Sequence, residues 1–372
     1  MRVIFFTRDF SPHDHRFLSA LAKTEHEVFL LRLERLDTGV DDRSLPDVEQ
    51  ILWRGGSRRA RWSDYPTLCM DMKRVIQRFQ PDLIHAGPIQ RCALLTAMAG
   101  FHPLVSMSWG SDLLLDADRT SLSRQATRYT LNRSDVLVGD CQAVADKAVA
   151  YGFDPRRIVL FPWGVDLAHF SPQPSSNLRA RLGWEDAFVV LSLRSWESLY
   201  GVDTVVRAFV RAARQHPELR LLLLGSGSQA ATLRSILMEA GMLERVHFGG
   251  QVSLADLPGY YRAADLYVSA SYSDGSSVSL MEALACGLPA LVSDIPGNRE
   301  WIAPGVHGWL FLPGDEEALA AGILGACQQR KNLSVMQQAA RQLAEQRADW
   351  SINFPKLLQA YQLALQGGAS HG

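Results

Sequence analysis

Two successive series of short, nearly continuous apolar segments, separated by stretches long enough for helices, constrain the fold of this sequence most strongly. Strands buried on both faces of a parallel sheet appear as unbroken apolar runs, and the intervening helices form the crossover connections. The first series comprises Val3–Phe6, Glu27–Leu33, Leu83–His85, Leu104–Ser108, Val136–Gly139 and Ile158–Phe161; the second comprises Val189–Leu193, Arg220–Leu224, Val246–Gly249, Leu266–Ser269, Pro289–Ser293 and Gly308–Leu312. The pattern predicts an α/β protein with two Rossmann-like, doubly wound domains facing a cleft.

A break between the two series predicts the domain boundary. Residues Pro162–Glu185 are rich in proline and serine and show neither helical nor strand periodicity. We therefore expect an N-terminal domain at 1–165, a linker at 166–185 and a C-terminal domain at 186–349. The apolar spacing in Trp350–Leu365 predicts a final helix at about residues 350–366, which we expect to pack back onto the first domain.

Composition excludes several classes of protein. Lys plus Arg number 38 and Asp plus Glu number 39, so a net charge of −1 argues against a nucleic-acid-binding protein. The five cysteines are scattered without a C-x-x-C pair, which favours a reducing compartment and no zinc site. With no signal-peptide core and no apolar run near ~18 residues, we expect a cytoplasmic protein that could visit the membrane surface as a peripheral one.

The loop after the strand at Leu266–Ser269 is the sharpest candidate for binding chemistry. Asp274, Gly275, Ser276 and Ser277 are followed by a predicted helix from Val278, whose N-terminal amides could bind a phosphate. Glu282, one turn into that helix, could accept two hydrogen bonds from a ribose diol. The alternative is purely structural, because Ser279 and Glu282 also have the spacing of a capping box.

This segment resembles the retaining, GT-B-fold glycosyltransferases of family 4, also called glycosyl transferases group 1. Their hallmark is E-x7-E, and Asp274 stands where the first Glu belongs. Residues Pro162–Pro172 and His247–Ser271 resemble two further segments of the family, and the register holds from Pro81 to Ile302. The matching positions in the hallmark segment are Ser271, Gly275, Glu282, Ala283, Ala285, Gly287 and Pro289.

The resemblance implies transfer of a hexosyl unit, with retention of configuration, from a nucleotide-sugar to a sugar or lipid-linked acceptor, as in polysaccharide or glycolipid synthesis. Glu282 would hold the ribose, and Asp274 would contact the donor sugar as a catalytic residue. No cofactor is expected beyond a UDP-, GDP- or ADP-linked substrate, and no metal site. The other expected donor-binding residues are Gly275, Ser276, Ser277, Val278, Gly225, Gly227 and Val252.

Arg194 aligns with the arginine of the family's G-R-x-x-x-x-K-G segment. A guanidinium suits the leaving diphosphate, because it forms paired contacts to phosphate oxygens and stays charged. The family lysine is absent, because Tyr200 precedes Gly201 and the loop is one residue longer. Arg299, or an arginine of the first domain, could supply the missing charge. The absent lysine, together with Asp274 in place of the first Glu, also leaves open a catalytically silent partner subunit that binds the donor without turnover.

An NAD-dependent oxidoreductase is the remaining alternative. Residues Gly225–Ala230 fit G-x-G-x-x-A after an apolar run, and Glu244 lies 19 residues after Gly225. The fit is weak, since the ribose-binding acid should end the next strand, whereas Glu244 precedes it.

On the acceptor side, four residues follow strands of the first series. His85 lies in a segment that resembles the family's D-x-x-H-x-H loop, and Trp109, Gly110 and Asp112 resemble its H-G-x-D loop. Trp109 replaces the family histidine and could stack on a sugar ring. A histidine satisfied at a strand end is an equally good interpretation of His85.

Residues Trp53–Trp62 contain four arginines and two tryptophans, and allow two interpretations. A solvated loop is the simpler one. The other is a reversible contact with an anionic membrane surface, with tryptophan at the interface and arginine on the head groups. Arginines of the next helical segment would extend that patch or form its solvated face: Arg119, Arg124, Arg128 and Arg133.

Overall fold

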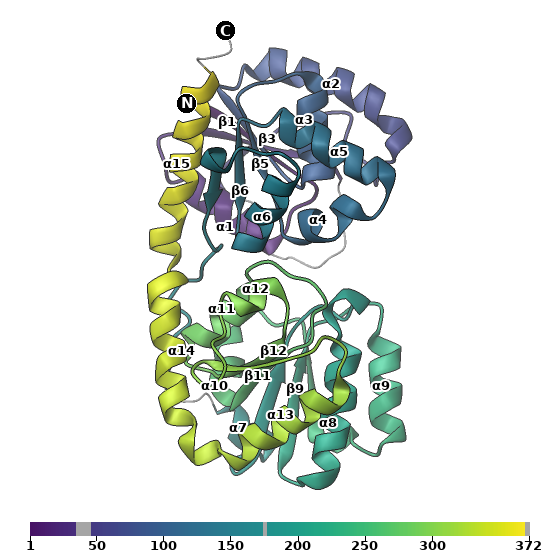
Figure 1. The fold of residues 1–372 in the computed structure, drawn as a ribbon, viewed down its shortest axis with the longest axis vertical. Coiled ribbons are helices and arrows are strands. Elements are labelled where there is room, and N and C mark those ends of the chain that lie inside the picture. Colours follow the sequence, from purple (N-terminus) through teal and green to yellow (C-terminus); the bar gives the residue numbers. More distant parts are fainter. Residues whose placement is uncertain (35–45, 174–176, 369–372) are drawn as a thin grey trace. The chain divides into compact units, whose positions relative to one another are not determined.

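The computed structural model describes residues 1–34, 46–173 and 177–368, which form two compact units (Figure 1). The first unit consists of Met1–Trp163 together with Ser351–Gly372, and the second of Gly164–Trp350. Each unit is built on its own parallel sheet.

The first unit has a sheet of order β3-β2-β1-β4-β5-β6-β7. Its strands are β1 (Arg2–Thr7), β2 (Glu27–Arg32), β3 (Glu49–Gln50), β4 (Leu83–Ala86), β5 (Leu104–Met107), β6 (Val136–Gly139) and β7 (Ile158–Leu160). Its helices are α1 (Pro12–Leu21), α2 (Tyr65–Phe79), α3 (Leu94–Ala99), α4 (Ser111–Leu114), α5 (Ser121–Asn132), α6 (Gln142–Ala150) and α15 (Trp350–Gly368), which starts at the unit boundary. The strand order reverses between β1 and β4, which is where such sheets usually bind ligands.

Successive residues of β1 enter opposite faces of the first sheet. Ile4 and Phe6 pack in the core beneath α2 and α3. Phe5 points to the other face, where its ring lies 6.5 Å from that of Phe17 on α1 and 4.7 Å from that of His85. This alternation explains why every residue from Val3 to Phe6 is apolar.

The second unit has a sheet of order β10-β9-β8-β11-β12-β13. Its strands are β8 (Phe188–Ser192), β9 (Leu219–Leu224), β10 (Val246–Gly250), β11 (Leu266–Ser269), β12 (Ala290–Ser293) and β13 (Gly308–Phe311). Its helices are α7 (Leu178–Leu182), α8 (Val202–Gln215), α9 (Ala230–Glu239), α10 (Leu257–Ala263), α11 (Val278–Ala285), α12 (Pro296–Arg299), α13 (Glu316–Gln328) and α14 (Leu333–Arg347).

Helices cover both faces of the second sheet (Figure 1). On β8, Val190 packs in the cluster that contains α8, α9 and α13, whereas Val189 and Leu191 pack in the cluster that contains α10, α11 and α14. The prediction of two doubly wound, Rossmann-like α/β units is therefore confirmed.

The prediction of a linker at 166–185 is wrong for its described part; residues 174–176 of it lie outside the described residues. Phe170, Leu178 and Trp184 are buried in the core of the second unit, and Leu178 begins the short helix α7. The periodicity is invisible because α7 has only five residues. The sequence pattern also missed β3, whose two residues pair with the edge of β2.

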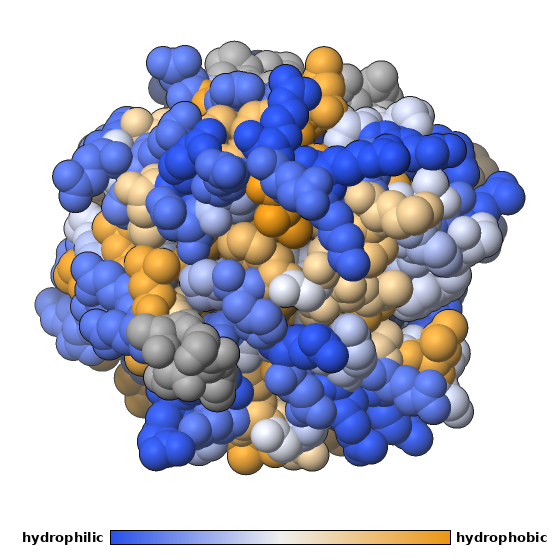
Figure 2. Space-filling view, turned by 90° about the horizontal axis from the view of Figure 1, so that it is seen from above, coloured by the Kyte–Doolittle hydropathy of each residue, from blue (hydrophilic) through white to orange (hydrophobic). Residues whose placement is uncertain are grey.

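The face seen in Figure 2 carries many hydrophilic residues, with hydrophobic residues interspersed among them. Within the described ranges, no helix combines the length and the apolar character that crossing a membrane requires.

Candidate active site

The predicted donor-binding residues of the second unit follow four neighbouring strands. Arg194 follows β8, Gly225 and Gly227 follow β9, Val252 follows β10, and the loop at 274–277 follows β11. These strands are adjacent in the order β10-β9-β8-β11, and the order reverses between β8 and β11. The sheet thus brings the predicted residues to one edge, at the position where doubly wound sheets bind nucleotides.

Arg194 lies at the centre of this edge. Its Nη1 donates to Ser277 Oγ at 2.7 Å and to Ser279 Oγ at 3.2 Å. Its Nη2 lies 2.8 Å from a carboxylate oxygen of Asp274. Burial, the largest influence, acts to lower the pKa of the guanidinium, but the Asp274 carboxylate and nearby tyrosines together raise that pKa above its ordinary value. Nε is buried without a hydrogen-bond partner among the described residues.

Tyr200 occupies the position of the family lysine and contacts the same arginine. The Arg194 guanidinium carbon lies 4.3 Å from the centre of the Tyr200 ring, which is the geometry of a cation–π contact. Arg299, considered above as a replacement cation, is instead bound by Asp294 through contacts of 2.6 and 3.1 Å. Tyr200 therefore holds the Arg194 guanidinium in place.

Helix α11 begins beside Arg194 without a side-chain cap. Ser277 is its N-cap residue and makes no capping hydrogen bond with its side chain. Ser279 does not form a capping box, because it lies inside the helix and its hydroxyl contacts Arg194, Tyr267 and Ser277. The structural alternative for this segment is thus wrong, and the positive end of the helix dipole lies next to the guanidinium.

Glu282 lies four residues after Val278, the first residue of α11, and only 6% of it is exposed. One of its carboxylate oxygens accepts a hydrogen bond of 2.8 Å from the Tyr261 hydroxyl, which also donates to Ser279 O at 3.1 Å. Tyr261 fixes the rotamer of Glu282; it lies within the His247–Ser271 segment that resembles the family, but sequence reasoning assigned it no role. The ribose-binding role of Glu282 stays a prediction.

The glycine loop after β9 packs closely against the chain that follows Arg194. Gly225 has φ +104°, and a Cβ there would lie 2.8 Å from Arg194 O. A Cβ on Gly227 would lie 2.6 Å from Trp196 O. Only glycine allows this approach, which draws the 194–197 segment over the end of β9. Glu244 lies before β10 in the short helix Leu243–Arg245, so it is not at a strand end as an NAD site requires.

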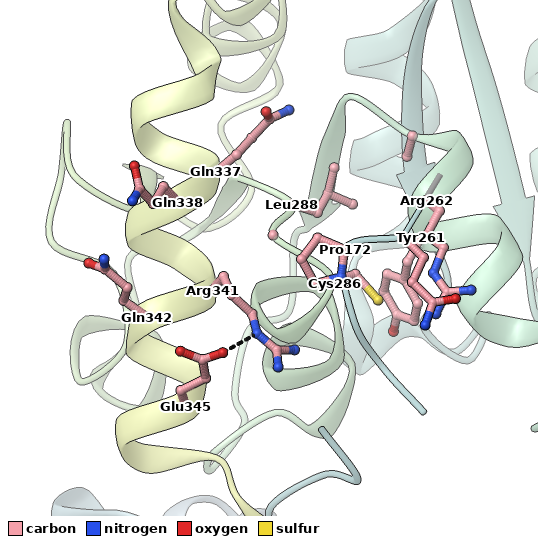
Figure 3. Close-up of a pocket in the computed structure, with 13 residues that line it drawn as sticks. Pro172, Tyr261, Arg262, Cys286, Leu288, Gln337, Gln338, Arg341, Gln342 and Glu345 are labelled. Atoms are coloured by element: carbon pink, nitrogen blue, oxygen red, sulfur yellow. Dashed lines mark hydrogen bonds and ion pairs between the residues drawn. The ribbon is translucent and has the colours of Figure 1, made fainter. Parts of the chain in front are cut away.

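A cavity of about 460 Å³ lies at the opposite end of α11 from Ser277 (Figure 3). Arg341 is held there by Glu345 at 2.7 Å and by Ala285 O at 2.7 Å. The hydrogen-bond partners of Arg341 are thus groups of the protein itself. Within the described ranges, no cluster of His, Cys, Asp or Glu has the geometry of a metal site.

His85 does not present its side chain to an acceptor. It is 1% exposed, and its Nδ1 lies 2.8 Å from the Tyr361 hydroxyl on α15, while Nε2 lies 3.2 Å from Met107 Sδ. Burial lowers the pKa of His85 to about 3, so the imidazole is neutral. The interpretation as a satisfied histidine is the one that fits this position.

Asp112 also has a structural role. Its Oδ1 accepts from Ser108 Oγ at 2.7 Å and from Trp109 N at 2.9 Å, and its Oδ2 accepts from Ile89 N at 2.9 Å. Gly110, with φ +87°, begins the helical turn that carries it. Backbone and serine donors thus hold the Asp112 carboxylate in one orientation, and its acceptor-side role stays a prediction.

Trp109 is partly buried within an aromatic cluster of the first unit. Its ring centre lies 5.9 Å from that of His13, stacked, and 5.8 Å from that of Trp163. The ring is therefore held in one orientation, and its acceptor role stays a prediction.

The two tryptophans of the Trp53–Trp62 segment have different surroundings. Trp53 is partly buried, with Nε1 donating to Arg32 O at 2.7 Å and its ring against Phe6. It is thus not available at a membrane interface. Trp62 is 41% exposed and lies beside Arg91.

Two parallel, doubly wound units, with a guanidinium and an uncapped helix N-terminus at the switch point of the second, define a GT-B type of protein. The model of the glycosyl transferases group 1 matches residues 175–343, and that of glycosyl transferase 4-like domains matches residues 2–140. The chain belongs to this family, which is family 4 of the GT-B glycosyltransferases.

The chain is 31% identical over 242 residues to D-inositol 3-phosphate glycosyltransferase of Segniliparus rotundus, covering 63% of this chain and 54% of that protein. The matched part thus spans about half of that relative. It is 25% identical over 308 residues to the GDP-mannose-dependent alpha-(1-6)-phosphatidylinositol monomannoside mannosyltransferase of Mycolicibacterium smegmatis, covering 78% and 79%. The structure of Anabaena Alr3699/HepE with UDP-glucose has a TM-score of 0.80 at 21% identity, covering 97% and 99%, a likeness of fold.

Proposed function

We propose that the protein is a retaining glycosyltransferase that moves a hexosyl unit from a nucleotide-sugar to an acceptor hydroxyl. The observation that supports this most is the position of Arg194 beside the N-terminus of α11, at the switch point of the second sheet. Both groups are positive and fixed before any ligand arrives, so they suit a diphosphate whose charge grows as the sugar leaves.

In this mechanism the protein positions and stabilises charge, without a side-chain base. Arg194 and the amides at Ser277 and Val278 bind the diphosphate, and Glu282 binds the ribose. Asp274 contacts the donor sugar, and a leaving phosphate oxygen takes the acceptor proton on the same face. Gly225, Gly227 and Val252 complete the donor site, with the backbone of Val252 beside the base.

The acceptor proposed is a sugar or a lipid-linked sugar, within cell-surface polysaccharide or glycolipid synthesis. Two relatives bear names that specify an inositol phosphate and a phosphatidylinositol mannoside, and each is an acceptor that carries phosphate. The proposed location is the cytoplasm, with reversible contact to the inner face of the membrane through residues 54–62.

A thermal-shift panel of UDP-, GDP- and ADP-sugars beside NAD tests the function. We expect one class of nucleotide-sugar to raise the melting temperature, and the same compound to be hydrolysed slowly or transferred. Arg194→Ala and Glu282→Ala should lose this activity by tenfold or more. Arg234→Ala is the matched control, because Arg234 also stacks on an aromatic ring, Phe248, but lies on α9 outside the site.

Each other result identifies an alternative. Stabilisation by NAD alone would contradict the proposal. Binding of a nucleotide-sugar without any turnover would instead identify a silent partner subunit.

A further inference from the structure

A cavity of about 420 Å³ opens in the first unit at the carboxyl ends of β1, β4 and β5. This is the switch point of the first sheet, and the volume is that of a small-molecule site. Its lining includes neither His85 nor Trp109. The side chains that give it its chemical character are Arg8, Trp62, Arg91, Asp116, Arg119 and Ser123.

Three guanidinium groups line this cavity, and they are compensated to different degrees. Arg8 Nε lies 3.0 Å from the buried carboxylate of Glu34. Arg119 lies 3.9 Å from Asp116, and both are largely exposed, so this pair is weak. Among residues 1–34, 46–173 and 177–368, no carboxylate pairs with Arg91.

Neutral groups hold Arg91 in position. Its guanidinium carbon lies 5.5 Å from the centre of the Trp62 ring, and that ring stacks on Tyr65 at 4.8 Å. Arg91 lies in a π-helical turn, Ile89–Ala93, which directly follows β4. Such turns are rare and occur frequently at functional sites. Aromatic rings thus orient the Arg91 guanidinium, and they do not compensate its charge.

The other carboxylate in the lining, that of Asp112, is engaged by donors other than Arg91. Asp112 is 5% exposed, and its two oxygens are occupied by the three donors described above. Burial raises its pKa above the ordinary value. The lining therefore holds three guanidinium groups and two carboxylates, with hydroxyls of Thr120 and Ser123 beside them.

We infer that this cavity binds the phosphate group of a small phosphorylated acceptor, with Arg91 as the principal anchor and Arg8 and Arg119 as supporting cations. A planar guanidinium forms paired hydrogen bonds to phosphate oxygens, and an uncompensated one gains most from them. The inference rests on the proposed function, since it names the acceptor class for the same reaction. The acceptor hydroxyls face Thr120, Ser123 and Asp116.

Calorimetric titration with glycerol 3-phosphate, inorganic phosphate and glycerol tests this inference. We expect both phosphates, but not glycerol, to bind with millimolar or better affinity and to change the fluorescence of Trp62. Arg91→Gln should weaken binding at least tenfold. Arg78→Gln should not, because Arg78 also lies beside an aromatic ring, Phe79, but is outside the cavity. Equal affinity of wild type and Arg91→Gln, or equal binding of glycerol, would overturn the inference.

Arg119→Gln is a second variant that should fold normally, because the Arg119 side chain is 78% exposed and the fold does not depend on it. We expect it to weaken glycerol 3-phosphate binding severalfold, and unchanged affinity in both variants would overturn the inference. Vesicles of phosphatidylcholine with phosphatidylglycerol identify the source of the phosphate. Arg91-dependent binding to them supports a lipid headgroup, and Arg91-dependent binding of glycerol 3-phosphate alone supports a soluble acceptor. Nucleotide-sugar binding, measured separately, decides the proposed function.

Discussion

The guanidinium carbon of Arg194 lies 4.3 Å from the centre of the ring of Tyr200, the residue that stands where the family resemblance implies a lysine. The aromatic ring fixes the one remaining cation from one side, while Ser277, Ser279 and Asp274 fix it from the other. Arg194 is thus held from two sides before any ligand binds.

Tyr200→Ala should reduce donor turnover, because Arg194 would lose the ring that restrains it. A cation–π contact is worth about 0.5–2 kcal/mol, which corresponds to a loss of about two- to thirtyfold in rate. Steady-state kinetics with the donor identified by thermal shift would measure this. Tyr200→Phe keeps the ring and should retain the wild-type rate; equal losses in both variants would show that the hydroxyl, not the ring, is what counts.

Asp274→Asn should destabilise the ligand-free protein and increase the stabilisation that a nucleoside diphosphate provides. The substitution removes the charge partner of a mostly buried guanidinium, at a cost of about 1–3 kcal/mol. A diphosphate would then replace the lost charge without competing for Nη2. Melting curves with and without the nucleotide measure both effects, and an unchanged ligand-induced shift would contradict the idea.

Gly297→Ala should impair donor binding by displacing the loop that carries Asp274. A Cβ at Gly297, on α12, would lie 2.2 Å from Gly275 O and 2.7 Å from Asp274 O. Such overpacking costs about 1–3 kcal/mol. Gly325→Ala is the control, because a Cβ there meets nothing within 4 Å inside α13 and should stabilise the helix slightly. Donor affinity is the measurement, and equal affinities in the two variants would refute the expectation.

His85 should make the first unit less stable as the pH falls. Burial lowers its pKa from 6.5 to about 3 in the folded state, so the unfolded chain binds more protons between these values. The contribution of neutral His85 to the free energy of unfolding is fully present above pH 6.5. It is lost on acidification, by about 1 kcal/mol between pH 7 and 5.5. Asp14 acts oppositely, since burial raises its pKa to about 6 and protonation then favours the folded state.

Urea unfolding of wild type and His85→Gln at pH 7 and 5.5 isolates this contribution. The glutamine removes the titrating group, and its amide can still contact Tyr361. The variant should therefore lose about 1 kcal/mol less than wild type on acidification. The same loss in both proteins would exclude His85 as the source.

All strands except β3, and the gathering of Arg194, Gly225 and the 274–277 loop at one edge of the second sheet, could be predicted from sequence. Buried parallel strands leave unbroken apolar runs, and the glycine and serine loops directly follow them. The directions of side chains at strand ends could not be predicted. His85 and Asp112 lie in segments that resemble the family's acceptor loops. In the structure, however, His85 contacts Tyr361, 276 residues away, and Asp112 accepts a hydrogen bond from Ile89 N. The cavity around Arg91 was missed because its lining comes from separate segments and its π-helical turn leaves no periodicity in the sequence.

Helix α15 has a consequence for the order in which the chain acquires structure during synthesis. Leu357, Ala360, Tyr361 and Ala364 are fully buried, and the Tyr361 hydroxyl is a partner of His85 in the first sheet. A ribosome makes these residues only after all of the second unit. The first unit, although begun first, therefore lacks α15 and the Tyr361 partner of His85 Nδ1 until the second unit has been made. A chain cut after Trp350 would contain a complete second unit and an unfinished first one.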